Sequence, residues 1–150
     1  MRRVQWNHCI LGTALCVAAV ACGGSGASPT SPQCSETVLL EGGAPLAANS
    51  FYTDPITVNS AGRVDIVLDW DIAGSRIGLY MTPSGTCPIA SFNARTCNFL
   101  IRSEDGSKPR RVSASNIAAG RYDVHTVNSA EQSQVATIRV SLKSETCPPL

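Results

Sequence analysis

The sequence predicts an all-β domain, an antiparallel β-sandwich, for residues 34–150. Apolar and polar residues alternate at period two along several short segments, as they do in strands buried on one face. Turn-forming Gly, Pro, Asn and Ser residues separate these segments. No segment carries the 3.6-residue apolar period of a long helix. Residues 34–150 have the usual size of one domain.

The clearest predicted strand is Arg63–Ile72. We expect one of its faces to lie in the core and the other to carry acidic residues, because successive side chains point to opposite sides of a sheet. The predicted core face carries Val64, Ile66, Leu68, Trp70 and Ile72. The predicted outer face carries Asp65, Val67, Asp69 and Asp71.

The remaining predicted strands, in chain order, are Thr37–Glu41, Phe51–Thr53, Ile56–Asn59, Arg76–Thr82, Asn98–Arg102, Arg111–Ser115, Arg121–Asn128 and Gln134–Lys143. In two of them the buried face follows from the alternation. Those faces carry Ile77, Leu79 and Met81 in one strand and Ala136, Ile138, Val140 and Leu142 in the other. Ser113–Ala119 is expected to form at most one helical turn.

Residues 50–142 resemble the bacterial pre-peptidase C-terminal (PPC) domain in four segments, the first three of which are as follows. They are Gly62–Trp70, which is similar to its Gly-x-Leu-x-Val-x-Leu-x-Trp strand, Ile77–Tyr80, similar to its Leu-x-Leu-Tyr strand, and Ala119–Val124, similar to its Ala-Gly-Thr-Tyr-Tyr-Val segment. The closing strand Thr137–Leu142 corresponds to its terminal Tyr-x-Leu-x-Val. The resemblance implies a β-sandwich with jelly-roll character. The family domain usually follows a secreted protease, and a cysteine loop such as 87–97 is not typical of it.

The pair Gly120 and Tyr122 has a structural interpretation of its own. Glycine permits a tight entry into the strand. We expect the tyrosine hydroxyl to return to an upstream backbone group, as in a tyrosine corner.

The N-terminus has the pattern of an export signal. The basic start Met1–Arg3 precedes the apolar stretch Ile10–Ala21, which is too short for a membrane span of about 20 residues. We therefore predict a signal peptide over residues 1–21.

Cys22 lies where this stretch ends, after small residues, and resembles the lipobox cysteine of bacterial lipoproteins. The resemblance implies that Cys22 carries acyl chains such as palmitate and anchors the protein to the cell membrane or outer membrane. The domain would then face the periplasm or the exterior. A plain secretory signal cut near Ala21 is the alternative. Residues 23–33 are rich in Gly, Ser and Pro and are expected to form a flexible tether.

Seven cysteines are present, and Cys9 and Cys16 belong to the predicted signal peptide. The four in the domain allow three pairings, and an even number in an exported domain suggests two disulfides. We favour Cys34–Cys147, which would brace the two ends of the domain, and Cys87–Cys97, which would close a short loop. A zinc site is the rival interpretation, but no Cys-x-x-Cys pair is present and His125 is the only histidine after the signal.

The net charge of the chain does not favour nucleic acid as a partner. Removal of the signal peptide takes two of the 12 basic residues and none of the 11 acidic ones, so ten basic residues remain and the formal charge becomes −1. A protein that binds nucleic acid usually carries a basic face. No cofactor is predicted.

Two acidic groupings are candidate sites. Asp65, Asp69 and Asp71, with Asp123, offer oxygen ligands for calcium. Residues two apart on a strand are about 6.6 Å apart, so a solvated sheet face is the simpler interpretation. Asp123 and His125 share a face and suggest acid–base chemistry. No nucleophile accompanies them, so we expect His125 to be an ordinary surface residue and the protein not to be an enzyme.

The segment 87–97 is the remaining candidate surface. If the disulfide closes it, Ile89, Phe92 and Arg95 become anchors for a partner on a rigid loop. The alternatives are a protease-inhibitor loop that presents Arg95, and a braced hairpin whose Ile89 and Phe92 cover the sandwich. The sequence thus predicts a membrane-anchored, non-enzymatic binding or structural module of the bacterial envelope, with a protein or polysaccharide as its ligand.

Overall fold

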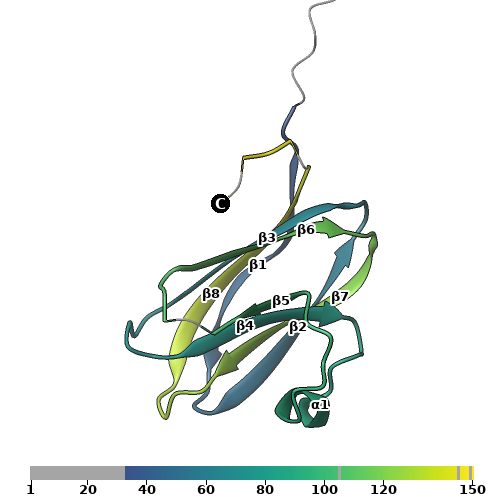
Figure 1. The fold of residues 1–150 in the computed structure, drawn as a ribbon. Coiled ribbons are helices and arrows are strands. Elements are labelled where there is room, and N and C mark those ends of the chain that lie inside the picture. Colours follow the sequence, from purple (N-terminus) through teal and green to yellow (C-terminus); the bar gives the residue numbers. More distant parts are fainter. Residues whose placement is uncertain (1–32, 105, 145, 149) are drawn as a thin grey trace, which may run out of the picture. The chain divides into compact units, whose positions relative to one another are not determined.

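A computed structural model describes residues 33–104, 106–144, 146–148 and 150 of the chain. Two four-stranded antiparallel sheets pack face to face in this part of the chain (Figure 1). The strands are β1 (Glu36–Leu46), β2 (Ser50–Val58), β3 (Gly62–Trp70), β4 (Ile77–Pro83), β5 (Ile101–Ser103), β6 (Arg110–Ile117), β7 (Gly120–Asn128) and β8 (Gln134–Lys143), and the one described helix is α1 (Ile89–Asn93). The predicted all-β sandwich is confirmed.

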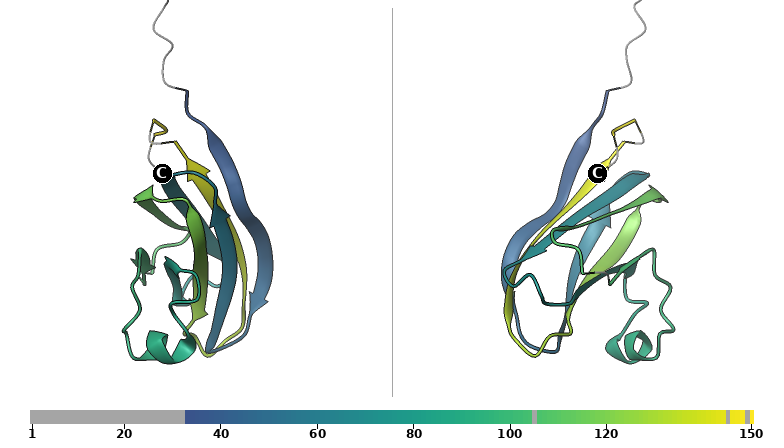
Figure 2. Two further views of the ribbon diagram at one scale, coloured as in Figure 1. Left: turned by 90° about the vertical axis from the view of Figure 1, so that its right-hand side faces the viewer. Right: turned by 60° about the vertical axis from the view of Figure 1, so that its left-hand side comes forward.

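The strand order gives the sandwich its jelly-roll topology. One sheet has the order β1-β8-β3-β6 and the other β2-β7-β4-β5. Strands therefore pair in a nested way, first with last and second with second-last, as in a chain wound into a double-sheet jelly roll. Figure 2 shows the two layers from the side, with α1 outside the layer that contains β2, β7, β4 and β5.

The core lies between the sheets and follows the predicted alternation. Val64, Ile66, Leu68 and Trp70 of β3 are buried. Ile77, Leu79 and Met81 of β4, and Ala136, Val140 and Leu142 of β8, are buried as well. Two residues depart from the prediction. Ile138 of β8 is only partly buried, and the Ile72 side chain is 40% exposed, because β3 ends at Trp70 and the chain turns before reaching it.

Three strands differ most from their predicted extent, and the first is β5 (Ile101–Ser103), which contains only the end of the predicted segment Asn98–Arg102. The segments Phe51–Thr53 and Ile56–Asn59 form the single strand β2, with Pro55 inside it. Proline is tolerated there because β2 is an edge strand, where no neighbour requires its missing N–H. β1 continues through Gly42 and Gly43 to Leu46, since its pairing with β8 overrides the weak strand preference of these residues.

Residues 113–117 belong to strand β6, so the single helical turn allowed for Ser113–Ala119 is not formed. The described helix lies elsewhere, at α1, in the loop after β4. Five residues are too few to show an apolar period, which is why the sequence did not indicate it.

Both predicted disulfides are present. Cys34–Cys147 joins the chain before β1 to the tail after β8, with the two Cα atoms 4.6 Å apart. Arg63 of β3 also holds this tail, because its Nη1 donates to the Cys147 carbonyl at 2.9 Å. Cys87–Cys97 closes the loop that carries α1. The two ends of the domain and the α1 loop are therefore each covalently fixed.

The predicted tyrosine corner is confirmed. Tyr122 is largely buried, and its hydroxyl donates to the carbonyl of Ala118, four residues upstream, at 2.9 Å. This bond ties the connection between β6 and β7 to the start of β7.

The predicted signal peptide, Cys22 and most of the tether lie outside the described residues. Within residues 33–150, apart from the three that are not described, no helix is long and apolar enough to cross a membrane.

Candidate binding surface around helix α1

A cluster of aromatic side chains lies on the outer face of the sheet β2-β7-β4-β5. Phe51 and Tyr80 project from β2 and β4, and Phe92 from α1 packs on both with its ring centroid 4.8 Å from each. Phe99 completes the group, 5.3 Å from Tyr80 and 5.8 Å from Phe92. Most of these contacts are edge-to-face, the favoured geometry of aromatic pairs. We call these four residues the aromatic cluster.

The Cys87–Cys97 disulfide and local hydrogen bonds hold α1 over this cluster. Phe92 N–H donates to the Pro88 carbonyl, and Thr96 N–H to the Ser91 carbonyl, each at 3.0 Å. A five-residue helix is not stable by itself in water. Its stability must come from the closed loop and from the packing of Phe92.

A shallow depression of about 240 Å³ lies on one side of Phe92. We call it the arginine depression, and its lining residues are Tyr80, Phe92, Asn93, Arg95, Phe99, Arg102 and Glu104. Glu104 accepts a hydrogen bond from Arg102 Nε at 2.8 Å. That bond raises the pKa of Arg102 and, together with one from Tyr80, lowers the pKa of Glu104.

Tyr80, Phe92 and Phe99 form the aromatic part of this depression. The Arg102 guanidinium lies 5.9 Å from the centre of the Phe99 ring, within cation–π range. Burial, helped by its hydrogen bond to Glu104, raises the pKa of Tyr80 to about 12. The hydroxyl therefore remains a neutral donor at all physiological pH values.

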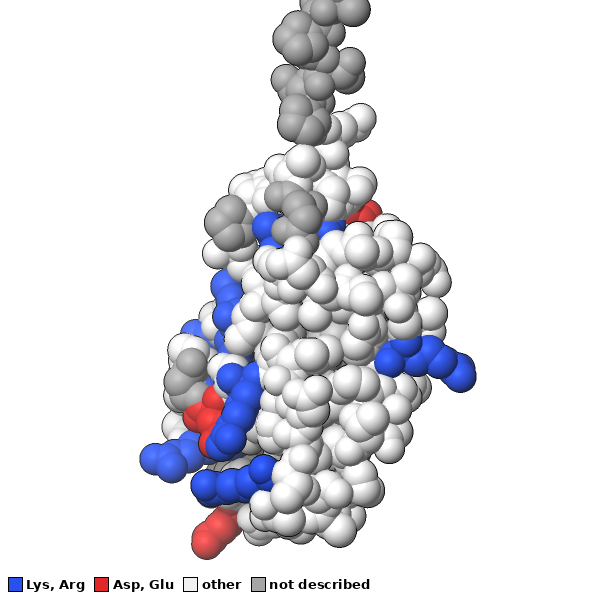
Figure 3. All heavy atoms as spheres, turned by 45° about the vertical axis from the view of Figure 1, so that its right-hand side comes forward, with Lys and Arg blue, Asp and Glu red and all other residues white. Residues whose placement is uncertain are grey.

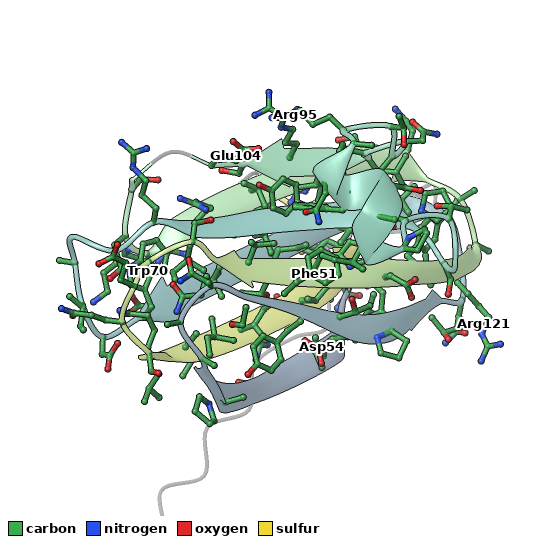
Figure 4. All side chains as sticks on the ribbon, turned by 90° about the horizontal axis from the view of Figure 1, so that it is seen from below. Phe51, Asp54, Trp70, Arg95, Glu104 and Arg121 are labelled. Atoms are coloured by element: carbon green, nitrogen blue, oxygen red, sulfur yellow. A yellow bond between two sulfur atoms is a disulfide. The ribbon has the colours of Figure 1, made fainter. Side chains whose placement is uncertain are left out.

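Arg95 is the unusual member of the depression. Its φ is 58°, in the left-handed region, which costs a residue with a Cβ roughly 1–2 kcal/mol. Among the described residues it makes no hydrogen bond or ion pair through its side chain, although its charge lowers the pKa of Glu104. Figure 4 shows Arg95 and Glu104 next to each other beside α1.

A second depression, of about 330 Å³, lies on the other side of Phe92. We call it the asparagine depression, and it is lined by Asn49, Ser50, Phe51, Ile89, Phe92, Asn93, Val127, Asn128 and Ser129. Phe92 and Asn93 line both depressions. The two depressions therefore adjoin, and together they form what we call the α1 surface.

The three residues predicted as partner contacts all lie on the α1 surface. Phe92 stands at its centre, Arg95 lines the arginine depression, and Ile89, 50% exposed, lines the asparagine depression. Sequence reasoning missed Tyr80, Phe51, Arg102 and Glu104. The outward position of Tyr80 between buried Leu79 and Met81 was the one signal that could have indicated an aromatic outer face.

His125 is not the exposed surface residue that the sequence predicted. It is 1% exposed, and Thr53 and Thr82 lie within hydrogen-bond distance of its two ring nitrogens, at 2.9 and 3.0 Å. The Phe51 ring stacks on it at 5.0 Å. Burial lowers the pKa of His125, although the nearby Asp123 acts in the opposite direction.

Asp65 also differs from its prediction, because it is buried rather than part of a solvated face. Burial alone would raise its pKa, but hydrogen bonds from Ser113, Arg63 and Lys143 lower it overall. Its carboxylate lies 3.0 Å from Arg63 Nε, 2.7 Å from Ser113 Oγ and 3.2 Å from Lys143 Nζ. The long side chains of Arg63 and Lys143 exclude water from it.

These partners also bear on the calcium interpretation. The carboxylate oxygens of Asp65 are paired with the side chains of Arg63 and Lys143. The carboxylate of Asp71 accepts hydrogen bonds from the backbone N–H groups of Ile72 and Val135. Among the described residues, no three Asp, Glu, His or Cys side chains lie where they could jointly hold a metal ion.

A separate apolar cavity of about 170 Å³ lies between the edge strands β1 and β2. Leu40, Leu46, Leu68, Ala136 and Ile138 contribute its apolar walls. Gly42 lies at this cavity without a side chain to fill it, and a Cβ placed there would meet no atom within 4 Å. Tyr52, Asp54 and Thr126 contribute the polar groups of its lining.

Figure 3 shows one side of the molecule with its charges. Most of the visible surface is uncharged, and Lys and Arg side chains gather along one flank with acidic side chains among them.

No family model and no curated protein matches the sequence. The resemblance to the PPC domain therefore stays a prediction. Among solved structures, the chain is similar to the carbohydrate-binding module CBM6cm-2 of Cellvibrio mixtus lichenase 5A, solved in complex with cellotriose. The identity is 12%, the TM-score is 0.38, and the match covers 71% of this chain and 88% of that one. No residue role is transferred from this similarity.

Proposed function

We propose that the protein is a lipid-anchored, non-enzymatic module that binds a polysaccharide of the bacterial envelope through its α1 surface. The anchor is Cys22, on the evidence of its lipobox-like setting. The residues 23–33 act as the tether between the membrane and the domain. Catalysis is not part of the proposal, because the lining side chains of the α1 surface include no nucleophile paired with a base.

One observation carries the binding proposal. The α1 surface is held in shape by a disulfide and by the aromatic cluster, so little conformational freedom is lost when a ligand binds. A loop that served only to connect β4 with β5 would not need this bracing.

The chemistry of the lining favours a sugar chain. Aromatic rings offer apolar faces to the C–H groups of a sugar ring, and the depressions surround them with side chains that donate and accept hydrogen bonds. Asn93 lies at the junction of the two depressions, where both can be used at once. Adjoining shallow depressions suit a linear polymer of rings better than one compact ligand.

The protease-inhibitor interpretation of the loop finds no support. A loop that mimics a substrate presents an extended segment, whereas residues Ile89–Asn93 are helical and Arg95 has a φ of 58°.

The binding proposal is tested by affinity electrophoresis and calorimetry with a panel of neutral and acidic polysaccharides. The full chain is expressed in an exporting bacterial host and purified as that host delivers it. We expect Phe92→Ala to weaken binding about tenfold, equivalent to roughly 1.4 kcal/mol. Phe92→Leu, which keeps most of the packing volume, should also weaken binding while leaving the stability nearly unchanged.

Tyr52→Ala is the matched control, because Tyr52 is an exposed aromatic residue that lines the β1–β2 cavity instead. It should leave binding unchanged. If no polysaccharide binds, or if Phe92→Leu binds as tightly as the wild type, the proposed function is wrong.

The anchor has an independent test. Intact mass after reduction should show Cys22 with attached acyl chains, and Cys22→Ser should release the protein from the membrane fraction. An unmodified Cys22 in the exported protein would contradict this part of the proposal.

A further inference from the structure

We infer that the arginine depression selects an anionic sugar unit, a uronic acid whose carboxylate is bound by Arg95 and Arg102. This inference rests on the proposed function and specifies its ligand. According to this inference, the arginine depression makes the protein prefer charged over neutral polysaccharides, and Arg95 contributes most of that preference.

The first argument is charge. The depression is lined by two arginines and one glutamate, a net charge of +1, on a domain whose predicted processed chain has a formal charge of −1. A guanidinium binds a carboxylate through two parallel N–H donors, which adds directional specificity to the attraction.

The second argument is that the two arginines are not equivalent. Arg102 already gives its Nε to Glu104 and lies against Phe99. Arg95 is an exposed residue that lines the depression and forms no ion pair with any described residue, although its charge lowers the pKa of Glu104. The guanidinium of Arg95 is therefore the group that an incoming carboxylate meets first.

The third argument is the backbone at Arg95. The position after a short helix with positive φ is one where glycine or asparagine is usual. An arginine is held there at a conformational cost, on a loop closed by a disulfide. Unfavourable backbone geometry is often found at functional sites, and here it places the positively charged side chain of Arg95 where it could contact a ligand.

A sugar acid fits the depression better than an acidic peptide. About 240 Å³ accommodates roughly one sugar ring, and the polar groups of Asn93 and Glu104 beside aromatic Phe92 and Phe99 match a unit that carries hydroxyls, a C–H face and one carboxylate. The aromatic side chains pack on one another, so they leave no deep apolar hole for a peptide side chain.

The test compares polygalacturonate with its fully methyl-esterified form, which has the same backbone without the charges. The full chain described above is titrated with both polymers by calorimetry. We expect polygalacturonate to bind at least tenfold more tightly in 50 mM NaCl, and this preference to shrink as the salt concentration rises.

Variants assign the preference to residues. Arg95→Gln should weaken binding of polygalacturonate about tenfold and leave binding of the methyl ester unchanged, and Arg95→Lys should give an intermediate result because it keeps the charge but loses the fork. Glu104→Gln should tighten binding of polygalacturonate about threefold, since it removes a repelling carboxylate. Arg121→Gln is the matched control, because Arg121 is exposed on β7 away from Arg95 (Figure 4), and it should change nothing.

The outcomes separate this inference from the proposed function. Equal binding of the two polymers, or binding of neutral polysaccharides alone, overturns the inference and leaves the proposed function standing. Tighter binding of polyglutamate than of polygalacturonate overturns the assignment to a sugar acid. Binding to none of the polysaccharides overturns both.

Discussion

The ring of Phe92 meets the ring of Tyr80 edge-to-face, with an interplanar angle of 89° and centroids 4.8 Å apart. Phe92 belongs to a short helix in a surface loop, and Tyr80 to a strand in the middle of a sheet. Their contact joins the only described helix to the sandwich and fixes the position of the α1 surface. Phe92, a loop residue, is thus held in place by packing on Tyr80, whose side chain projects away from the core.

The two disulfides should have different consequences when removed. In the chain-entropy model the Cys34–Cys147 bond, with a separation of 113 residues, contributes about 5 kcal/mol, and the Cys87–Cys97 bond, with a separation of 10, about 3 kcal/mol. Paired Cys→Ser variants should therefore unfold at different denaturant concentrations. The variant without Cys34–Cys147 should be the less stable of the two.

The two disulfide variants should rank in the reverse order when their affinities for polysaccharide are compared. The variant without Cys87–Cys97 should lose ~10-fold in affinity, because the α1 surface is then no longer held in shape. The variant without Cys34–Cys147 should bind normally wherever it is folded. Equal losses of affinity in the two variants would contradict the role given to the α1 loop.

Asp65→Asn should destabilise the domain by about 3–5 kcal/mol, because it leaves buried Arg63 without its counterion and leaves Lys143 with only its longer contact to Glu36. Asp69→Asn is the matched control on the same strand. Its side chain is 49% exposed and pairs with Lys108 at 3.5 Å, so its loss should cost less than about 1 kcal/mol. Chemical denaturation measures both, and similar values for the two variants would show that Asp65 is not an electrostatic centre of the sheet.

His125 should make stability depend on pH in a defined direction. Its pKa is lowered in the folded state, so below the unfolded value of about 6.5 the unfolded chain binds more protons. Stability is therefore fully present above that pH and decreases as the pH falls toward the lowered folded pKa. The decrease can reach about 1.4 kcal/mol per pH unit.

The comparison that isolates this effect is His125→Gln, which keeps a polar side chain between Thr53 and Thr82 but does not titrate there. Denaturation curves between pH 7 and pH 5 should fall less steeply for the variant than for the wild type. Parallel curves would mean that another group causes the decrease.

Gly42→Val should raise the unfolding free energy by about 0.5–1 kcal/mol, because valine favours strands and its methyl groups enter the β1–β2 cavity. Gly43→Val is the matched control, since a Cβ there lies 3.3 Å from the Ala136 carbonyl oxygen and should crowd β8. Polysaccharide binding should be unchanged in Gly42→Val. A loss of binding on filling this cavity would place the ligand there and not at the α1 surface.

The sandwich could be predicted because its strands alternate so regularly. The buried faces of β3, β4 and β8 follow from period two alone, and the even number of cysteines suggested two disulfides, although the favoured pairing was one of three that the sequence allowed. The tyrosine corner was predictable from Gly120 and Tyr122. The alternation and the tyrosine corner depend on residues that are close in sequence, and each disulfide joins the two ends of one stretch of chain.

The α1 surface could not be predicted in the same way, because its members come from different strands. Phe51, Tyr80 and Phe99 meet Phe92 only after β2, β4 and β5 are placed in one sheet. His125 and Asp65 were misjudged for a related reason. Alternation assigned them to outer faces, but it does not reveal that Phe51 covers one of them or that Lys143 covers the other.

Mapping of amide chemical shifts by NMR tests the account most directly. Addition of the polysaccharide that binds most tightly to the ¹⁵N-labelled protein should shift the resonances of Phe92, Asn93, Arg95 and Arg102, together with those lining the asparagine depression. Resonances of Leu40, Gly42 and Ile138 at the β1–β2 cavity should stay in place. Shifts confined to that cavity, or to Glu36, Glu41 and Arg139, which form ion pairs between β1 and β8, would contradict a ligand site at α1.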